Sequence, residues 1–306
     1  MDTELIDRRT RWYLYTAVLA FGLLVMTYVV FVRTEWGQRF DDIAFDGRDI
    51  EDPEITRTAN DLLHTVTRST LLLLTASIVA FALARRRVRL ALAAGAAITA
   101  SVVTTELLKL RVLDRPDLDG VAGIEQNSFP SGHATIGMAL SLGIVMVAPH
   151  RTRWIAAVVA VVTSTAFGVG VLATGWHRPS DSVAASLVCV IMFCLATAAL
   201  LKWRGAGDDV MGAVEERLTP AAAAVAWLGA VAAAATGLVL TFRESDVRTV
   251  EFAVDYVLMC LVVIAFGAAI VIGYDGSLRG VSLDAPARSG EPSPARSGEP
   301  SPGRPT

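Results

Sequence analysis

Charged residues are scarce in this chain of 306 residues. They make up 19% of the sequence, whereas 53% of the residues are hydrophobic and the mean hydropathy is +0.51. A soluble domain of ordinary composition is about 25% charged, so this chain has too little charge to solvate its surface. The net charge of −3 gives no support for a nucleic-acid partner. The composition therefore predicts a membrane protein rather than a soluble or nucleic-acid-binding one.

Cysteine and lysine are also rare. The three cysteines, Cys189, Cys194 and Cys260, lie inside apolar runs, which excludes a secreted disulfide scaffold. Only two of the 27 basic residues are lysines, Lys109 and Lys202. Arginine would serve as well as Lys202 in the basic cluster that contains it. Lys109 instead lies in a polar segment, and the choice of lysine there points to a specific requirement.

Eight apolar runs approach the length that crosses ~30 Å of hydrocarbon. They cover residues 12–32, 69–84, 89–108, 134–149, 154–174, 182–201, 220–241 and 252–273. The second and fourth are short, and each could instead be a buried helix. We predict an all-α fold, a polytopic helical membrane protein with a six-helix core and two extra C-terminal transmembrane helices.

Short basic clusters separate alternate runs, and the positive-inside rule then predicts an orientation. They lie at Arg8–Arg11, Arg85–Arg89, Arg151–Arg153 and Lys202–Arg204. With eight crossings, all four clusters and both termini fall on the cytoplasmic side of an integral cell-membrane protein. The acid-rich connection 33–67 then falls outside, where we predict a solvated face or a lid over a site.

The apolar runs also divide the chain. We predict a cytoplasmic N-terminus over residues 1–11 and a core over 12–205 that includes the acidic external loop 33–67. Two additional transmembrane helices are predicted within 206–273. The remaining tail, 274–306, contains the octamer Ala-Arg-Ser-Gly-Glu-Pro-Ser-Pro twice without change. Such a composition buries too little apolar area to offset its ordering entropy, so we predict a disordered tail.

Two polar segments interrupt the apolar pattern, and both fall on the predicted outer face. The first begins at Glu106 and contains Lys109, Arg111, Arg115 and the sequence Pro130-Ser131-Gly132-His133. The second reads Gly175-Trp176-His177-Arg178-Pro179-Ser180-Asp181. Together they hold two of the four histidines of the chain.

These segments carry groups suited to phosphate chemistry. A turn such as Ser131-Gly132 before a helix exposes backbone N–H groups and the positive end of the helix dipole, which favour an anion. His133 beside that turn could donate a proton to a leaving oxygen. His177 and Asp181 are four residues apart, so the carboxylate could fix the imidazole tautomer and leave Nε2 as a nucleophile.

Each of these groups also has a plainer interpretation. Lys109 and Arg115 match phosphate oxygens, the lysine as a point charge and the arginine as a planar fork, but both could be anchors at the membrane boundary. His177 with Asp181 could be an interfacial histidine paired with an acid, and a Pro-Ser-Gly turn is also an ordinary helix cap. Their occurrence together favours the functional interpretation.

The segments resemble the type-2 phosphatidic acid phosphatase superfamily, which includes the lipid phosphate phosphatases. That family carries the motifs Lys-x6-Arg-Pro, Pro-Ser-Gly-His and Ser-Arg-x5-His-x3-Asp. The second motif is intact at residues 130–133, and the His-x3-Asp part of the third is present at 177–181. The resemblance covers about residues 69–200 and implies a six-helix membrane phosphatase.

The resemblance also implies roles for individual residues. His177 would attack phosphorus and become a phospho-histidine, Asp181 would orient it, and His133 would protonate the leaving group. Further groups would hold the equatorial oxygens, where charge accumulates in the transition state. These phosphate-binding residues are Lys109, Arg115, Ser131 and Gly132. The resemblance implies no metal and no other cofactor.

Two positions depart from the family pattern. Five residues rather than six separate Lys109 from Arg115, so on a continuous helix the two side chains would not share a face. The Ser-Arg pair of the third motif is Gly170-Val171 here, and valine cannot bind phosphate. We consider Arg111 and Arg178 as compensating cations, only because they are near in sequence.

We expect metal-independent hydrolysis of a phosphomonoester or pyrophosphate lipid at the outer membrane face. Phosphatidate, phosphatidylglycerol phosphate and polyprenyl phosphates or diphosphates all fit as substrates. Two alternatives stay open. One is a phosphotransferase that passes the phosphate to an alcohol. The other is a catalytically weak lipid-phosphate binding or transport protein. The absence of the motif arginine is the reason to consider it. No feature of the sequence identifies a protein partner.

Overall fold

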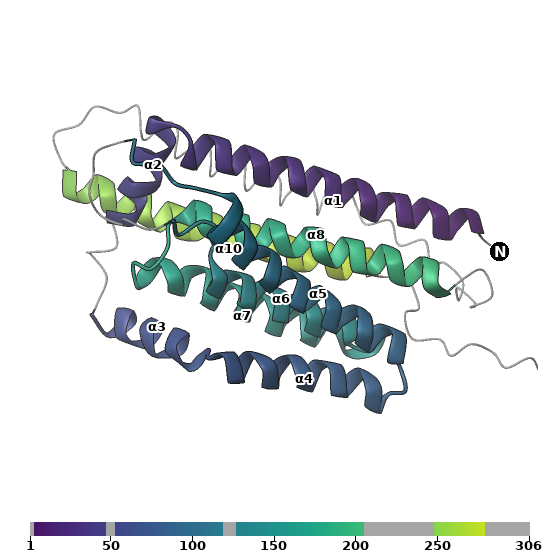
Figure 1. Ribbon diagram of the computed structural model, residues 1–306. Helices are drawn as coiled ribbons and strands as arrows, with labels where there is room; N and C mark the ends of the chain where they lie inside the picture. Colours follow the sequence, from purple (N-terminus) through teal and green to yellow (C-terminus); the bar gives the residue numbers. More distant parts are fainter. Residues whose placement is uncertain (1–2, 47–52, 119–126, 205–247, 279–306) are drawn as a thin grey trace, which may run out of the picture.

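The protein is a bundle of long helices, as Figure 1 shows for its computed structural model, which describes residues 3–46, 53–118, 127–204 and 248–278. Throughout these residues the regular secondary structure is helical, which confirms the predicted all-α class. The elements are α1 (Thr3–Val32), α2 (Glu35–Asp46), α3 (Pro53–Thr65), α4 (Arg68–Ala84), α5 (Val88–Leu107), the π-helix η2 (Leu108–Val112), α6 (Gly132–Val147), the 3₁₀-helix η3 (His150–Thr152), α7 (Arg153–Ala173), α8 (Pro179–Arg204) and α10 (Arg248–Leu278).

Among the described residues, five helices are long and apolar enough to cross a membrane: α1, α5, α7, α8 and α10. A further span forms if α3 and α4 act together, although the pair bends by 70°. The predicted runs from 12–32 to 182–201 correspond to α1 and α4–α8, and the run 252–273 lies within α10. The run predicted at 220–241 lies outside the described residues. These helices support an integral membrane protein.

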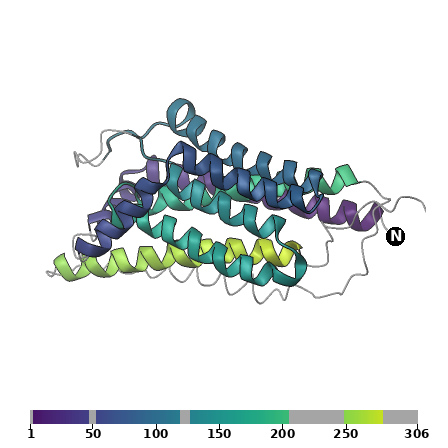
Figure 2. The same cartoon turned by 90° about the horizontal axis from the view of Figure 1, so that it is seen from below.

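The centre of the bundle is α6, which packs against α4, α5, α7, α8 and α10 (Figure 2). Twelve of its 16 residues are buried, which explains why this short run is apolar on every side. Outer helices instead expose large apolar side chains, such as Val18 on α1 and Leu72 on α4. Exposed apolar side chains in this number fit a surface that faces lipid.

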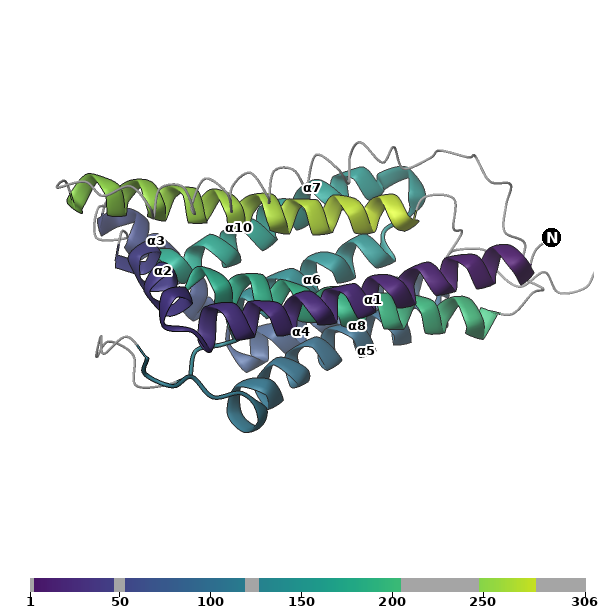
Figure 3. The ribbon, with the colours of Figure 1, turned by 90° about the horizontal axis from the view of Figure 1, so that it is seen from above.

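The two ends of the bundle differ in character (Figure 3). At one end lie the starts of α6 and α8, the end of α7, and the short helices α2 and α3. At the other end lie the start of α1, the α4–α5 and α6–α7 turns and the end of α8. The four basic clusters belong to these segments, so all four lie at this end. At this basic end, the Tyr13 hydroxyl donates to the Ser277 carbonyl at 3.1 Å, and Arg153 donates to the Leu278 carbonyl at 3.4 Å. These bonds fix the end of α10, which continues past the predicted limit of 273.

The connection 33–67 differs from the predicted loop, because it contains the helices α2 and α3. The chain folds back sharply between α1 and α2, and Gly37 makes this possible. A Cβ at residue 37 would lie 1.9 Å from the Val30 carbonyl oxygen, so only glycine fits. The sharp turn brings α2 across the motif-bearing end of the bundle.

The described residues of α2 include polar side chains that are buried against the bundle. Its inward residues are polar, with Gln38 and Asp41 both 2% exposed. The rings of Trp36 and Phe40 stack on one another with their centroids 5.7 Å apart, and Trp36 is 43% exposed. A surface helix of a soluble protein normally buries apolar side chains. Because the buried side chains here are polar, the sequence alone predicts a solvated loop for this segment.

Candidate active site

The best-defined pair at the motif-bearing end is His177 with Asp181. The His177 Nδ1 atom lies 3.2 Å from the Asp181 Oδ2 atom, and both side chains are buried. The same carboxylate oxygen accepts the backbone N–H of Arg178 at 3.0 Å, as an acid in the first turn of a helix commonly does. An imidazole whose Nδ1–H is held by a carboxylate presents an unprotonated Nε2, which is the form a nucleophile needs.

The end of α7 positions His177 through the backbone. The Val171 carbonyl accepts the N–H groups of both Trp176 and His177, each at 3.1 Å. Gly175 has a φ of 69°, the left-handed conformation that ends helices and that glycine adopts without strain. Pro179 then begins α8, where its missing N–H costs nothing. The histidine is therefore held in a short, tightly bonded turn between two long helices.

The Pro-Ser-Gly-His segment begins α6 beside this turn. Ser131 is fully buried, and its hydroxyl accepts the Ala134 N–H at 3.3 Å, so the side chain caps the helix. The backbone N–H of Ser131 donates to the Asp181 carbonyl at 3.1 Å, which ties this segment to α8. The Ser131 N–H already has an acceptor, so it is not available to bind an anion. The N–H groups of the first turn of α6, which begins at Gly132, are therefore better placed than Ser131 to bind an anion.

His133 lies on the side of the site that Trp176 covers. The Trp176 ring meets the His133 ring edge-on, with centroids 5.2 Å apart, and meets the His64 ring of α3 in the same way at 5.1 Å. Burial, together with the positive charges of His177 and Lys109, lowers the pKa of the His133 imidazole to about 4. The structure thus brings both motif histidines together, and it adds His64 of α3 on the other side of Trp176.

Lys109 reaches the same place through the π-helix η2. This wider turn begins at Leu108 directly after α5, and Asn127 donates to the Lys109 carbonyl at 3.1 Å and to the Leu113 carbonyl at 2.8 Å. A Cβ built on Gly132 would lie 3.9 Å from the Lys109 Nζ and 3.2 Å from a carboxylate oxygen of Glu106. Lys109 therefore lies beside the start of α6, despite the one-residue difference in spacing.

Arg115 lies behind the histidine–aspartate pair, between two carboxylates. Its guanidinium is 6% exposed, with one nitrogen 3.8 Å from Asp181 Oδ1 and the other 3.5 Å from Asp41 Oδ2. Neither nitrogen has a hydrogen bond of good geometry. The guanidinium is thus held by charge, with donor capacity left for a further acceptor.

Asp41, from α2, is the principal residue that the sequence analysis missed. Its Oδ1 accepts the Ser180 N–H at 3.1 Å, and its Oδ2 accepts the Ser180 hydroxyl at 2.5 Å. Burial, together with the negative charge of Asp181, raises the pKa of the Asp41 carboxyl to about 7, although Arg115 and Ser180 act in the opposite direction. The only sequence signal for this residue was the acidity of the segment, which equally fits a solvated surface.

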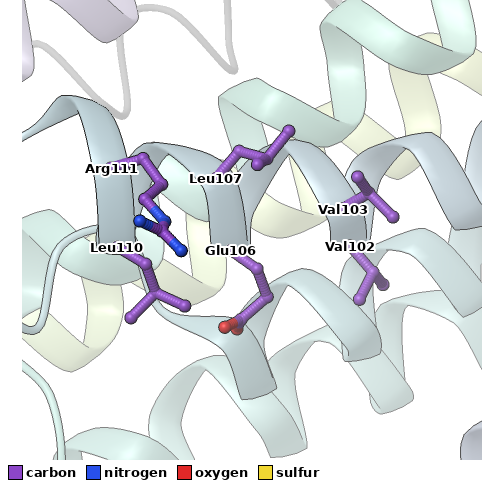
Figure 4. Close-up of a pocket in the computed structure, with 6 residues that line it drawn as sticks. All are labelled: Val102, Val103, Glu106, Leu107, Leu110 and Arg111. Carbon is purple, nitrogen blue, oxygen red and sulfur yellow. The ribbon is translucent and has the colours of Figure 1, made fainter.

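The two candidate compensating cations take different positions. Arg178 pairs with Asp42 of α2 through its Nε, so its charge is directed to that carboxylate. Arg111 is exposed and lines a pocket of about 350 Å³ on one face of α5 and η2, next to Leu107 and Leu110 (Figure 4). A compensating role for either arginine stays a prediction.

Val171 takes the position of the arginine in the third motif, and it is fully buried. It belongs to an apolar cluster that includes Leu63 of α3, Phe167 of α7 and Tyr256 of α10. Side chains from α3 and α10, which lie before and after the motif-bearing helices in the chain, therefore help to fill the space around this residue. The arrangement explains how the fold accommodates an apolar residue at this position.

Comparison with known proteins identifies a family that the motif-bearing segment resembles. Residues 89–204, from α5 to the end of α8, match the model of the PAP2 superfamily. The match contains all the motif positions discussed above, and it confirms the resemblance noted from the sequence.

One solved structure shares the PAP2 fold with this chain. It is described as the first transmembrane PAP2 type phosphatidylglycerolphosphate phosphatase, from Bacillus subtilis. The TM-score is 0.51 at 18% identity, and the alignment covers 61% of this chain and 97% of that one. At this identity the similarity shows the fold alone. No curated protein matches the sequence. The match over residues 89–204 and the shared fold support a membrane phosphatase in the broad sense.

Proposed function

We propose that this PAP2 protein hydrolyses the phosphoester or diphosphate bond of a lipid phosphate, without a metal ion, through a phospho-histidine at His177. The observation that carries the proposal is the buried His177–Asp181 pair at 3.2 Å. Lys109 and His133 lie at the same end of the bundle, and Lys109 also interacts with Asp181. Burial and the positive charges of His177 and Lys109 lower the pKa of His133 to about 4, so His133 acts as an acid once the negative charge of a bound phosphate favours its protonated form. The pair supplies a nucleophile, and its neighbours supply an acid and a cation.

The proposed reaction has two steps. In the first, His177 Nε2 forms a bond to phosphorus as the bond to the lipid oxygen breaks, and His133 gives its proton to that oxygen. In the second, His133 takes a proton from water, the water oxygen attacks phosphorus, and the N–P bond breaks to release phosphate. Lys109 and Arg115 stabilise the charge that develops on the equatorial oxygens.

The positive-inside rule supports an orientation with the site outside the cell. All four basic clusters lie at the end of the bundle opposite the site, and cytoplasmic loops of membrane proteins carry the excess of Lys and Arg. The exposed aromatic Trp36 on α2 lies at the site end, where it could meet lipid headgroups. A site at this level suits a substrate whose tail stays in the bilayer, such as phosphatidate, phosphatidylglycerol phosphate or a polyprenyl phosphate or diphosphate.

The test measures phosphate release by purified protein in detergent, from each of these lipids, with EDTA present throughout. The wild-type protein is expected to release phosphate from at least one of them, and His177→Ala is expected to release none. His150→Ala is the matched control, because His150 is exposed at the opposite end of the bundle. Activity that requires a divalent metal, or that survives in His177→Ala, would contradict the proposed mechanism.

A lipid-phosphate binding protein with little turnover is the second candidate, and the buried Val171 is the observation that favours it. Specific binding of a lipid phosphate, without phosphate release from any of the lipids, would support this candidate. Phosphotransfer would use the same phospho-histidine, with an alcohol in place of water. Recovery of a phosphorylated alcohol when one is added to the assay would distinguish it from hydrolysis.

A further inference from the structure

The α2 helix lies outside the segment that matches the PAP2 model, yet it contributes a buried carboxylate to the site. Asp41 is 2% exposed and comes from a helix whose inward face is polar. Burying a carboxylate is costly unless it is paired and hydrogen-bonded. The contacts that compensate this cost are therefore informative about what Asp41 does.

Asp41 joins two parts of the proposed catalytic machinery. Its carboxylate accepts two hydrogen bonds from Ser180, in the first turn of α8, at 3.1 and 2.5 Å. It also lies 3.5 Å from the guanidinium of Arg115, whose other nitrogen lies 3.8 Å from Asp181. The second oxygen of Asp181 holds His177. A continuous path of charges and hydrogen bonds thus runs from α2 to the proposed nucleophile.

A second residue of α2 holds the backbone next to Arg115. The Gln38 side chain donates to the Pro116 carbonyl at 2.7 Å and accepts the Leu118 N–H at 3.2 Å. It also donates to the Val32 carbonyl at the end of α1 at 2.8 Å. The arginine is therefore fixed at its backbone by Gln38 and at its guanidinium by Asp41, both from one face of α2.

We infer that Asp41 is a positioning residue for phosphoryl transfer, which sets the Arg115 guanidinium and the first turn of α8 relative to His177. The inference rests on the proposed function of the same site. The buried Val171 gives it weight, because a cation that the motif normally supplies is replaced by an apolar side chain. With one cation fewer at the site, the transition state depends more strongly on where the Arg115 guanidinium lies.

The experiment compares Asp41→Asn with Asp46→Asn at pH 8, using the lipid that the wild-type protein hydrolyses. Asp46 lies on the same helix and is exposed, so it is a matched control for the same chemical change. Asp41→Asn is expected to lower kcat by about 10- to 100-fold, because misplacing a group by about 1 Å has effects of this size. KM is expected to change by less than about three-fold, since the group acts mainly in the transition state. Asp46→Asn is expected to match the wild type.

A double-mutant cycle separates positioning from a general loss of structure. Because Asp41 acts in part through Arg115, Asp41→Asn should lower kcat by a smaller factor in an Arg115→Gln background than in the wild type. Equal losses in both backgrounds would overturn the inference. Wild-type kcat in Asp41→Asn would overturn it too, and raised activity would show that Asp41 competes with the phosphate instead.

Two controls keep the result interpretable. Size-exclusion chromatography after mild heating tests whether each variant is folded. If Asp41→Asn does not purify as a single species, Ser180→Ala removes one hydrogen bond to the same carboxylate, and a several-fold fall in kcat at constant KM is expected. Unchanged kcat in that variant would count against the inference. Absence of phosphate release by the wild-type protein would instead refute the proposed function itself.

Discussion

Restoring the arginine of the third PAP2 motif by Val171→Arg is predicted to destabilise this protein rather than to improve it. Val171 is 0% exposed and clusters with Leu63, Phe167 and Tyr256. Its carbonyl accepts the His177 N–H at 3.1 Å, so a shift of residue 171 also moves the proposed nucleophile. The substitution therefore tests whether the space around residue 171 is apolar and filled, with no room for a guanidinium.

The magnitude follows from burial. Overpacking a filled core costs about 1–3 kcal/mol. Leaving a guanidinium in apolar surroundings adds several kcal/mol per ion. The sum, about 4–8 kcal/mol, is comparable with the roughly 5–15 kcal/mol that stabilises a typical domain. We therefore expect a large loss of folded protein and of phosphate release.

The assay measures the midpoint of thermal unfolding in detergent, together with phosphate release. Val171→Leu serves as the control, because it adds volume without charge and should show only the overpacking cost. A Val171→Arg protein with the wild-type midpoint and higher activity would refute this reasoning. That result would mean that residue 171 opens toward the phosphate.

Three further predictions follow from the site. Asp181→Asn removes the acceptor of the imidazole proton and should lower kcat by roughly 100- to 10,000-fold in steady-state assays, whereas a loss below about ten-fold would contradict the assigned role. Gly132→Ala places a methyl group 3.2 Å from a Glu106 carboxylate oxygen and should reduce activity, whereas Gly22→Ala, where no atom lies within 4 Å, should not. The pKa of Asp41 is raised from 3.8 to about 7 by burial and by the charge of Asp181, so its contribution to stability is present below about pH 4 and is lost as the pH rises through 7. The unfolding midpoint of Asp41→Asn should therefore increase relative to the wild type between pH 5.5 and 8.5, and a constant difference would contradict the raised pKa.

Much of the fold was predictable because a membrane imposes simple requirements on a sequence. Apolar runs of nearly 20 residues mark helices, and the runs from 89–108 to 182–201 correspond to α5–α8. The residue types of the site were equally readable, since His177 and Asp181 occur at helical spacing. Their meeting at 3.2 Å agrees with that spacing.

Other features depend on tertiary contacts that leave little trace in the sequence. A π-helix has no strong sequence signal, so the route by which Lys109 reaches Gly132 could not be predicted from spacing. The carboxylate of Asp41 is buried because it pairs with the Arg115 guanidinium and accepts a hydrogen bond from the Ser180 hydroxyl. An acidic residue that is buried by partners more than 70 positions away looks the same in the sequence as one in solvent.

The most direct test of the proposed mechanism is to trap the phosphorylated enzyme. Purified protein is mixed with a radiolabelled lipid phosphate in EDTA, quenched in alkali during turnover, and digested for mass spectrometry. The account predicts one labelled residue, His177, and no label in His177→Ala. Phosphate release with label on another residue, or with no labelled protein at any time during turnover, would contradict it.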